Sequence, residues 1–224
     1  IDDTRQSGRT ACQYACGCAA MMATAPLWIK ICGMTTAAAI EAALAARVDA
    51  VGFVFAESIR RVTTSRACEL AAPIRGKLRC VAVTRHPLPE EVATILAEFA
   101  PDILQTDYAD LATLQLPVTL EVLPVLRAAG PLPTMLPSRA LFEGPQSGTG
   151  AATDWQQASR IAARTQTVLA GGLNAENVGA AIRTVRPFGV DVSSGVEAAP
   201  AVKSVMRIAE FVAAARQAAA EIDR

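Results

Sequence analysis

A cysteine at position 32 and a glutamate at position 143 are the side chains of this sequence best suited to acid–base chemistry. Each ends a short apolar run, and each is followed directly by a glycine. A thiol, with a reference pKa of about 8.5, acts as a base once it is partly ionised. A carboxyl group in an enclosed site can hold its proton near neutrality. Facing one ligand, Cys32 and Glu143 could take and give protons; the alternatives are a buried core cysteine and a solvated loop glutamate.

Two glycine turns in the C-terminal half could bind phosphate. Gly171 and Gly172 precede a helix-like segment that begins at Asn174, and Ser194 and Gly195 follow a later apolar run. A glycine turn that opens a helix presents free backbone N–H groups, and the helix dipole adds to their attraction for an anion. Each turn alone could be merely a tight turn, but the two together favour a phosphate site.

The elements that must position these residues alternate between short apolar runs and alanine-rich helical segments. We predict strands at residues 28–32, 50–55, 78–83, 103–106, 118–122, 140–143, 167–170 and 189–192. We predict helices at residues 36–46, 64–72, 89–99, 154–164, 174–185 and 203–221, with a short helical region at 107–115 and an irregular, proline-rich segment at 127–138. Such alternation is typical of a parallel sheet.

An open sheet and a closed barrel both fit this alternation. The sequence has no early G-x-G-x-x-G motif, which disfavours an open dinucleotide-binding sheet. Glycine turns after the seventh and eighth predicted strands favour a barrel, because phosphate sites often lie there. The predicted fold class is therefore α/β, a (β/α)8 TIM barrel with its chemistry at the C-terminal ends of the strands.

The composition argues against several classes of protein. The 224 residues carry a formal net charge of zero, with 52% hydrophobic and only 4% aromatic residues. Balanced charge and few aromatics argue against nucleic-acid binding, and no apolar run approaches the ~20 residues of a membrane span. The length fits one barrel, which we place at residues 26–224. Residues 1–25 are predicted to be a disordered N-terminal extension, and a natural start is expected at Met22 within it.

Histidine and cysteine usage predicts neither a metal nor a cofactor. Cys12, Cys16 and Cys18 lie in the extension with C-x3-C-x-C spacing, but no partner set for a metal is visible. His86 is the single histidine, and we expect it to be exposed in a loop. Nothing in the cysteine pattern demands an oxidising compartment, so the cytoplasm is the expected location.

Four strings of the chain resemble those of the phosphoribosylanthranilate isomerase family. They are Lys-Ile-Cys-Gly-Met-Thr at residues 30–35, Asp-Ala-Val-Gly-Phe-Val-Phe at 49–55, Leu-Ala-Gly-Gly-Leu-Asn at 169–174 and Arg-Pro-Phe-Gly-Val-Asp-Val-Ser-Ser-Gly-Val-Glu at 186–197. The first and the last string together are highly specific. The similarity runs from about Trp28 to the C-terminus.

The resemblance implies a (β/α)8 barrel that acts in tryptophan biosynthesis without metal or cofactor. Such an enzyme converts N-(5-phosphoribosyl)anthranilate to 1-(2-carboxyphenylamino)-1-deoxyribulose 5-phosphate by an Amadori rearrangement. The family's general base falls on Cys32, and the place of its general acid, an aspartate, is taken here by Glu143. Its arginine for the substrate carboxylate falls on Arg60 in the pattern Ser-x-Arg, with the adjacent Arg61 as the alternative.

The resemblance also implies binding residues for the rest of the substrate. The family's phosphate loops match Gly171, Gly172, Ser194 and Gly195, and Asp191 is a second carboxylate that could orient the substrate.

The chain departs from the family at Glu143, at Asp107 and at His86, which stands where the family often has an asparagine. Glu143 is one methylene longer than the family's aspartate, so that loop geometry must reposition its carboxyl. Asp107 stands where the family has a histidine.

Two other functions stay open. One is a different barrel enzyme acting on phosphosugars, such as a ProFAR-isomerase-like or an indoleglycerol-phosphate-synthase-like enzyme; Cys32 in place of an aspartate disfavours the ProFAR type. The other is a non-catalytic barrel that binds phosphate compounds or a partner enzyme. A phosphosugar is the expected partner, and the chain could be a monomer or a homodimer.

Overall fold

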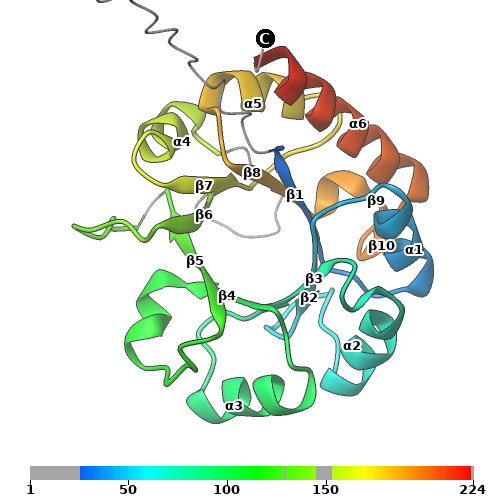
Figure 1. The fold of residues 1–224 in the computed structure, drawn as a ribbon, viewed down its shortest axis with the longest axis vertical. Coiled ribbons are helices and arrows are strands. Elements are labelled where there is room, and N and C mark those ends of the chain that lie inside the picture. Colours follow the sequence, from blue (N-terminus) through cyan, green and yellow to red (C-terminus); the bar gives the residue numbers. More distant parts are fainter. Residues whose placement is uncertain (1–25, 129, 145–152, 223–224) are drawn as a thin grey trace, which may run out of the picture.

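Eight parallel strands close into a barrel in chain order, so that β1 pairs with both β2 and β8. The computed structural model describes residues 26–128, 130–144 and 153–222. Figure 1 shows the ring of strands with helices around its outside. The strands are β1 (Trp28–Cys32), β2 (Ala50–Val54), β3 (Arg79–Val83), β4 (Ile103–Asp107), β5 (Glu121–Arg127), β6 (Arg139–Glu143), β7 (Gln166–Leu169) and β8 (Gly189–Val192). The predicted (β/α)8 barrel is confirmed, while the predicted extension, with Cys12, Cys16 and Cys18, lies outside the described residues.

Helices cover the outer face of this barrel. They are α1 (Ala37–Ala45), α2 (Thr64–Ala71), α3 (Pro89–Glu98), α4 (Trp155–Ala162), α5 (Val178–Val185) and α6 (Val205–Ile222). Three of them begin at side-chain caps, in which Thr36, Thr63 and Asp154 accept hydrogen bonds from backbone N–H groups of the first turn. Such caps satisfy donors that the helix leaves without partners.

Short elements complete the described fold. They are the 3-10 helices η1 (Ala72–Ile74), η2 (Tyr108–Ala112) and η3 (Ser194–Val196), and the two-stranded sheet of β9 (Glu197–Ala199) and β10 (Val202–Lys203). The last helix begins two residues later than predicted because Lys203 pairs in β10.

Side chains of the strands alternate between two apolar cores, because successive residues of a strand face opposite sides. The interior core contains Ala50, Val81, Ile103, Leu123, Val125, Leu141, Val168 and Ala170. The larger core lies between strands and helices and includes Ile29 and Ile31. Lys30 and Cys32 alternate with these two isoleucines on β1, so they face the interior of the barrel.

The fifth strand lies later in the chain than predicted. The prediction was residues 118–122, whereas β5 spans Glu121–Arg127. Val118 is fully exposed in the turn that precedes the strand. Pro124 lies inside β5 opposite Thr106, although a proline has no N–H for the ladder and normally argues against a central strand. The corrected position brings Arg127 to the C-terminal end of the barrel.

The β5–β6 connection contains no helix among its described residues, 128 and 130–138. Figure 1 shows an extended excursion there instead, as the irregular, proline-rich segment predicted. Between β4 and β5 the chain forms only the short η2 helix. The outer layer of helices is therefore thinnest around β5.

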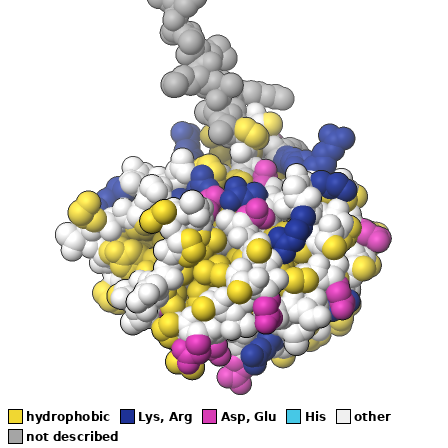
Figure 2. Space-filling model, turned by 60° about the horizontal axis from the view of Figure 1, so that its bottom comes forward, with side chains coloured by type: hydrophobic (Ala, Val, Ile, Leu, Met, Phe, Trp, Pro, Cys, Tyr) yellow, Lys and Arg dark blue, Asp and Glu magenta, His cyan; other side chains and the backbone are white. Residues whose placement is uncertain are grey.

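The surface mixes charges of both signs. Figure 2 shows Lys and Arg side chains beside Asp and Glu side chains on one face, with hydrophobic side chains between them. None of the helices in the described ranges combines the length and the apolarity that a membrane span requires.

Candidate active site

Seven of the eight predicted site residues line one cavity at the C-terminal end of the barrel. The cavity measures about 240 Å³. It is lined by Cys32, Arg60, Glu143, Gly171, Gly172, Asp191 and Ser194, among others. Gly195, the eighth, follows Ser194 in η3. Strand ends far apart in the sequence therefore meet here, as the barrel fold requires.

Cys32 faces this cavity from the end of β1. Gly52 on the neighbouring strand makes room for it, since a Cβ there would lie 3.0 Å from the Cys32 Sγ and 3.1 Å from the Lys30 Cε. Burial raises the pKa of the Cys32 thiol, and the nearby Lys30 ammonium opposes this shift. Burial outweighs the cation, so the net shift of the Cys32 pKa is upward, and Lys30 limits that shift.

A buried ion pair lies directly beneath the thiol. The Lys30 Nζ lies 2.9 Å from Asp191 Oδ1, and Lys30 has no exposed surface. Burial lowers the pKa of Lys30, but Asp191 and Cys32 outweigh that effect, so the net shift is upward. Lys30 therefore stays protonated next to Cys32. Sequence reasoning missed Lys30 as a site residue, although its period-two spacing from Cys32 could have revealed it.

Arg60 is held by a second buried carboxylate. Its Nε and Nη2 atoms donate to the two oxygens of Glu197 at 2.6 and 2.9 Å. Lys203 donates to the same carboxylate at 2.8 Å and to the backbone oxygen of Ser193 at 2.9 Å. Glu197 thereby connects the arginine after β2 to the turn after β8.

Arg60 and Arg61 differ in their surroundings. Arg60 is buried and lines the cavity that contains Cys32. Arg61 is exposed and lines a different cavity, of about 740 Å³, between the loops after β2 and β3. The geometry therefore favours Arg60 over Arg61 as the ligand of a substrate in the Cys32 cavity.

The charge on Glu197 should make the fold sensitive to acid. Burial raises the pKa of Glu197, but hydrogen bonds from Arg60 and Lys203 outweigh burial. The net result is a pKa of about 2, below the ordinary value of 4.5. A lowered folded-state pKa gives stability above pH 4.5 that is lost as the pH falls toward 2. We expect Glu197 to contribute about 3 kcal/mol to the loss of unfolding free energy at low pH. Glu197→Gln should remove this contribution. Urea titrations at several pH values measure the unfolding free energy of both proteins.

An exposed ion pair provides the control for this measurement. Glu69 bonds Arg66 on the surface of α2 at 2.9 Å, and such pairs contribute little. Glu69→Gln should leave the acid slope of the unfolding free energy as it is. An unchanged slope in Glu197→Gln would contradict the prediction.

The two glycine turns pack against each other. Gly171 and Gly172 have φ angles of 95° and 68°, which side chains other than glycine adopt at a cost. A Cβ on Gly195 would lie 1.9 Å from the carbonyl oxygen of Leu173. The turn after β7 and the turn after β8 can therefore meet only because position 195 carries no side chain.

We expect Gly195→Ala to force these turns apart. The displacement should raise the KM for a phosphorylated substrate roughly tenfold, a cost of about 1.4 kcal/mol, with a smaller change in kcat. The matched control is Gly130→Ala, because a Cβ on Gly130 meets only ordinary contacts at 3.6 Å and beyond. Steady-state kinetics of both variants decide, and an unchanged KM in Gly195→Ala would count against the expected displacement.

The C-terminal ends of β4, β5 and β6 carry a chain of ion pairs formed by Asp107, Arg127 and Glu143. Arg127 Nη1 lies 2.6 Å from Glu143 Oε1, and Arg127 Nη2 lies 2.6 Å from Asp107 Oδ1. All three side chains are mostly buried. Sequence reasoning missed Arg127 because the fifth strand was placed too early. With β5 in its true position, the alternation of Leu123, Val125 and Arg127 would have indicated an inward side chain.

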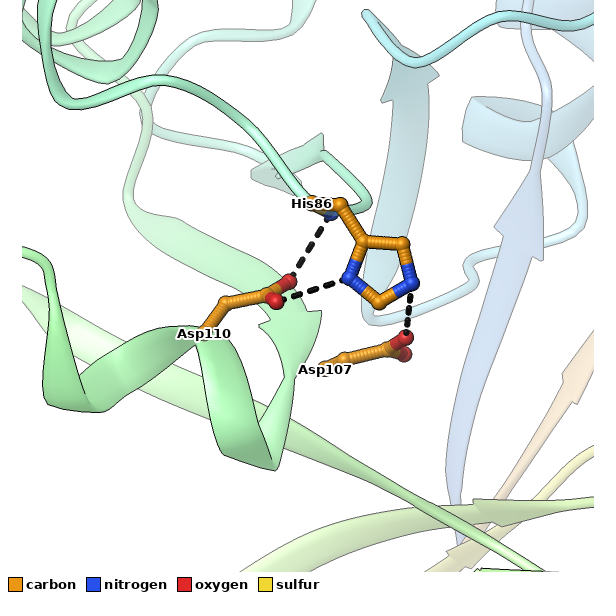
Figure 3. A group of neighbouring side chains, drawn as sticks. All are labelled: His86, Asp107 and Asp110. Carbon is orange, nitrogen blue, oxygen red and sulfur yellow. Dashed lines mark hydrogen bonds and ion pairs between the residues drawn. The ribbon is translucent and has the colours of Figure 1, made fainter.

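Asp107 also contacts His86, and Figure 3 shows the His86 ring between Asp107 and Asp110. His86 is exposed, as predicted, and its ring nitrogens lie 2.9 Å from Asp110 Oδ1 and 3.6 Å from Asp107 Oδ2. One ligand atom from each of these three residues lies within 4.8 Å of the others, as in a metal site. However, Arg127 also contacts both oxygens of Asp107, so the group forms an ion-pair network with its own cation.

The family of the chain follows from comparison with known sequences. A sequence model of the family described as N-(5'-phosphoribosyl)anthranilate (PRA) isomerase matches residues 29–214. The chain belongs to this family. The match covers β1 to β8 and most of α6, so it includes every strand end that lines the cavity.

Curated relatives and solved structures agree with this membership. The N-(5'-phosphoribosyl)anthranilate isomerase of Nitrobacter hamburgensis is 38% identical over 216 residues, which cover 88% of this chain and 95% of the relative. The structure of TrpF from Jonesia denitrificans superposes with a TM-score of 0.72 at 34% identity, covering 86% of this chain and 98% of that one.

One solved structure bears on the ligand of the family. It shows a phosphoribosyl anthranilate isomerase in complex with reduced 1-(o-carboxyphenylamino)-1-deoxyribulose 5-phosphate. It is 26% identical with a TM-score of 0.68, covering 85% of this chain and 99% of that one. The prediction that this chain is an isomerase of tryptophan biosynthesis is confirmed by its place in the family.

Proposed function

We propose that the chain converts N-(5-phosphoribosyl)anthranilate to 1-(2-carboxyphenylamino)-1-deoxyribulose 5-phosphate with Cys32 as base and Glu143 as acid. The observation that carries this assignment is that Cys32 and Glu143, from β1 and β6, line one cavity together with the two glycine turns. A thiol and a carboxyl group on the walls of one cavity are the pair that a proton shift between neighbouring atoms needs.

In the proposed reaction, Glu143 donates one proton to the substrate and Cys32 removes one proton from it. Glu143 gives a proton to the furanose ring oxygen, the bond from C1 to that oxygen breaks, and a Schiff base forms with the anilino nitrogen. The Cys32 thiolate then removes the proton from C2, and the electron pair of that bond forms the enolamine. Tautomerisation of the enolamine gives the ketone, and proton exchange with solvent restores both side chains.

The two ends of the substrate are assigned to different groups on the rim. Glu197 takes the Nε and Nη2 atoms of Arg60, so we assign the remaining nitrogen, Nη1, to the anthranilate carboxylate. The positive charge and the one remaining nitrogen of Arg60 can bind one oxygen of a carboxylate. Gly171, Gly172, Ser194 and Gly195 are assigned to the phosphate, through backbone N–H groups. Fixing both ends holds the reacting bond between acid and base.

Asp191 has a supporting role in this proposal. Its Oδ1 atom is held by Lys30, and its negative charge contributes to raising the pKa of Cys32. We assign it to fixing Lys30 beneath the thiol and to orienting the sugar hydroxyls. The charges of Lys30 and Asp191 beneath Cys32 then cancel each other in this proposal.

Complementation tests the proposed activity. A tryptophan-requiring strain that lacks this isomerase should grow when it expresses the chain from Met22 onward. Purified protein should consume the substrate with loss of anthranilate fluorescence, and the phosphosugar of the related histidine-pathway isomerisation serves as the comparison substrate. Ligand binding without product would instead favour the non-catalytic barrel, and turnover of the comparison substrate alone would favour the other barrel enzyme.

The compartment and the assembly state are also proposals. We infer a cytoplasmic enzyme, because nothing in the cysteine pattern demands an oxidising compartment. A solved relative from Thermotoga maritima is named as dimeric, and for this chain we retain a monomer or a homodimer. Size-exclusion chromatography with light scattering measures the molar mass in solution and decides between a monomer and a homodimer.

A further inference from the structure

The carboxyl of Glu143 is held by a side chain that comes from the neighbouring strand. Arg127 stands directly opposite Glu143 in the pairing of β5 with β6. Asp107 stands opposite Val125 in the pairing of β4 with β5, two residues before Arg127. Residues opposite each other in a parallel pair, or two apart on one strand, face the same side of the sheet. Asp107, Arg127 and Glu143 therefore all face the barrel interior.

Asp107 fixes the orientation of the guanidinium. Arg127 Nη2 donates to Asp107 Oδ1 at 2.6 Å, and Arg127 Nε donates to Asp107 Oδ2 at 3.3 Å. Two bonds to one carboxylate define a plane, because the guanidinium is rigid. The third contact, from Nη1 to Glu143 Oε1 at 2.6 Å, then reaches Glu143 from a fixed direction.

We infer that Arg127 is a positioning residue that aims the Glu143 carboxyl at the substrate, with Asp107 holding Arg127 in place. This inference rests on the proposed role of Glu143 as the acid. A glutamate side chain has three rotatable bonds, and a displacement of about 1 Å at a reacting group can cost roughly a hundredfold in rate. Arg127 and Glu143 both line the cavity, so this contact lies at its wall.

The network also sets the charge that Glu143 experiences. Arg127 favours the ionised carboxylate, which opposes the protonated form that the acid needs, and Asp107 offsets part of that opposition by sharing the same cation. Besides Arg127 and Glu143, the ionisable side chains among the described residues that line the cavity are Cys32, Asp191, Glu57, Arg60 and Arg85. Lys30 lies beneath Cys32 and Asp191, and His86 touches Asp107 from outside. Removal of Arg127 and neutralisation of Asp107 should therefore change the ionisation of Glu143 in opposite directions.

Kinetics of Arg127→Met test this inference. We expect kcat to fall by about 10- to 100-fold while KM changes less than threefold, because neither end of the substrate is assigned to Arg127. The limb of the pH profile of kcat that reports the ionisation of Glu143 should move about one pH unit upward in Arg127→Met. The same limb should move downward in Asp107→Asn. Arg127→Lys, which keeps the charge, should restore part of kcat and serves if Arg127→Met does not fold.

Arg139→Met is the matched control. Arg139 begins β6 at the opposite end of the barrel and bonds Glu121 on β5 at 2.6 Å, so its loss removes a comparable contact between β5 and β6 away from the cavity. We expect kcat of this variant to stay within twofold of the wild type, with an unmoved pH profile.

The outcomes separate this inference from the proposed acid. If Arg127→Met behaves like Arg139→Met while Glu143→Ala is inactive, Glu143 remains the acid and the positioning role is overturned. If Glu143→Ala keeps full turnover, the acid role and the positioning role fall together. Opposite displacement of the pH limb in Arg127→Met and Asp107→Asn, with Arg139→Met unmoved, supports the inference.

Discussion

Replacing Cys32 by alanine should lower kcat by about 10²- to 10⁴-fold, the usual contribution of a general base. The reason is geometric, because Cys32 ends β1 on the inner face of the barrel and lines the cavity. Serine at this position keeps the size but has a far weaker tendency to ionise, so Cys32→Ser should be nearly as impaired. Loss of anthranilate fluorescence in single-turnover experiments measures the effect.

A second buried cysteine separates loss of the base from loss of packing. Cys80 is fully buried on β3 but belongs to the core between strands and helices. Cys80→Ala should cost stability and leave kcat within a few-fold of the wild type. Full turnover in Cys32→Ala would remove the thiol from the mechanism, whatever the control shows.

Replacing Glu143 by alanine should also lower kcat by about 10²- to 10⁴-fold, since the ring oxygen would then lack its proton donor. Glu143→Asp should retain more activity than the alanine variant, because a carboxyl group is still present. Its shorter side chain would nonetheless lose the 2.6 Å contact with Arg127. Comparing kcat for the two variants across pH tests the assignment.

Glu121→Ala is the control for this pair. Glu121 begins β5 at the other end of the barrel and pairs with Arg79 and Arg139, so its loss should affect stability and not kcat. If Glu143→Ala turned over substrate as fast as the wild type, the acid would have to be sought elsewhere. Asp107 and Asp191 are then the next candidates, since both are buried at strand ends.

The barrel and most of the rim were predictable because they follow from local patterns. Short apolar runs, glycine turns and the string around Cys32 each occupy a few consecutive residues. The position of β5 was not predictable in this way, because Pro124 breaks the pattern of a central strand. That one displacement concealed Arg127.

The ion pairs beneath the site could not be read from local patterns at all. Lys30 lies 161 residues from Asp191 in the sequence, and Arg60 lies 137 residues from Glu197. Each charge alone resembles an ordinary solvated side chain. Only closure of the barrel brings the partners of these two pairs together and takes them out of water. The carboxyl of Glu143, by contrast, was expected to depend on its loop because the misplaced fifth strand concealed Arg127.

The pairing of the first strand with the last has a consequence for how the protein is made on the ribosome. β1 emerges early, yet its partner β8 and the counter-ion of Lys30 are among the last parts of the barrel to be synthesised. Until β8 is added, β1 and β7 present open edges to other chains, and the lysine beneath Cys32 lacks its carboxylate. The final strand therefore closes the ring and neutralises the charge of Lys30 beneath the cavity in the same event, so a chain shortened before Gly189 would lose both.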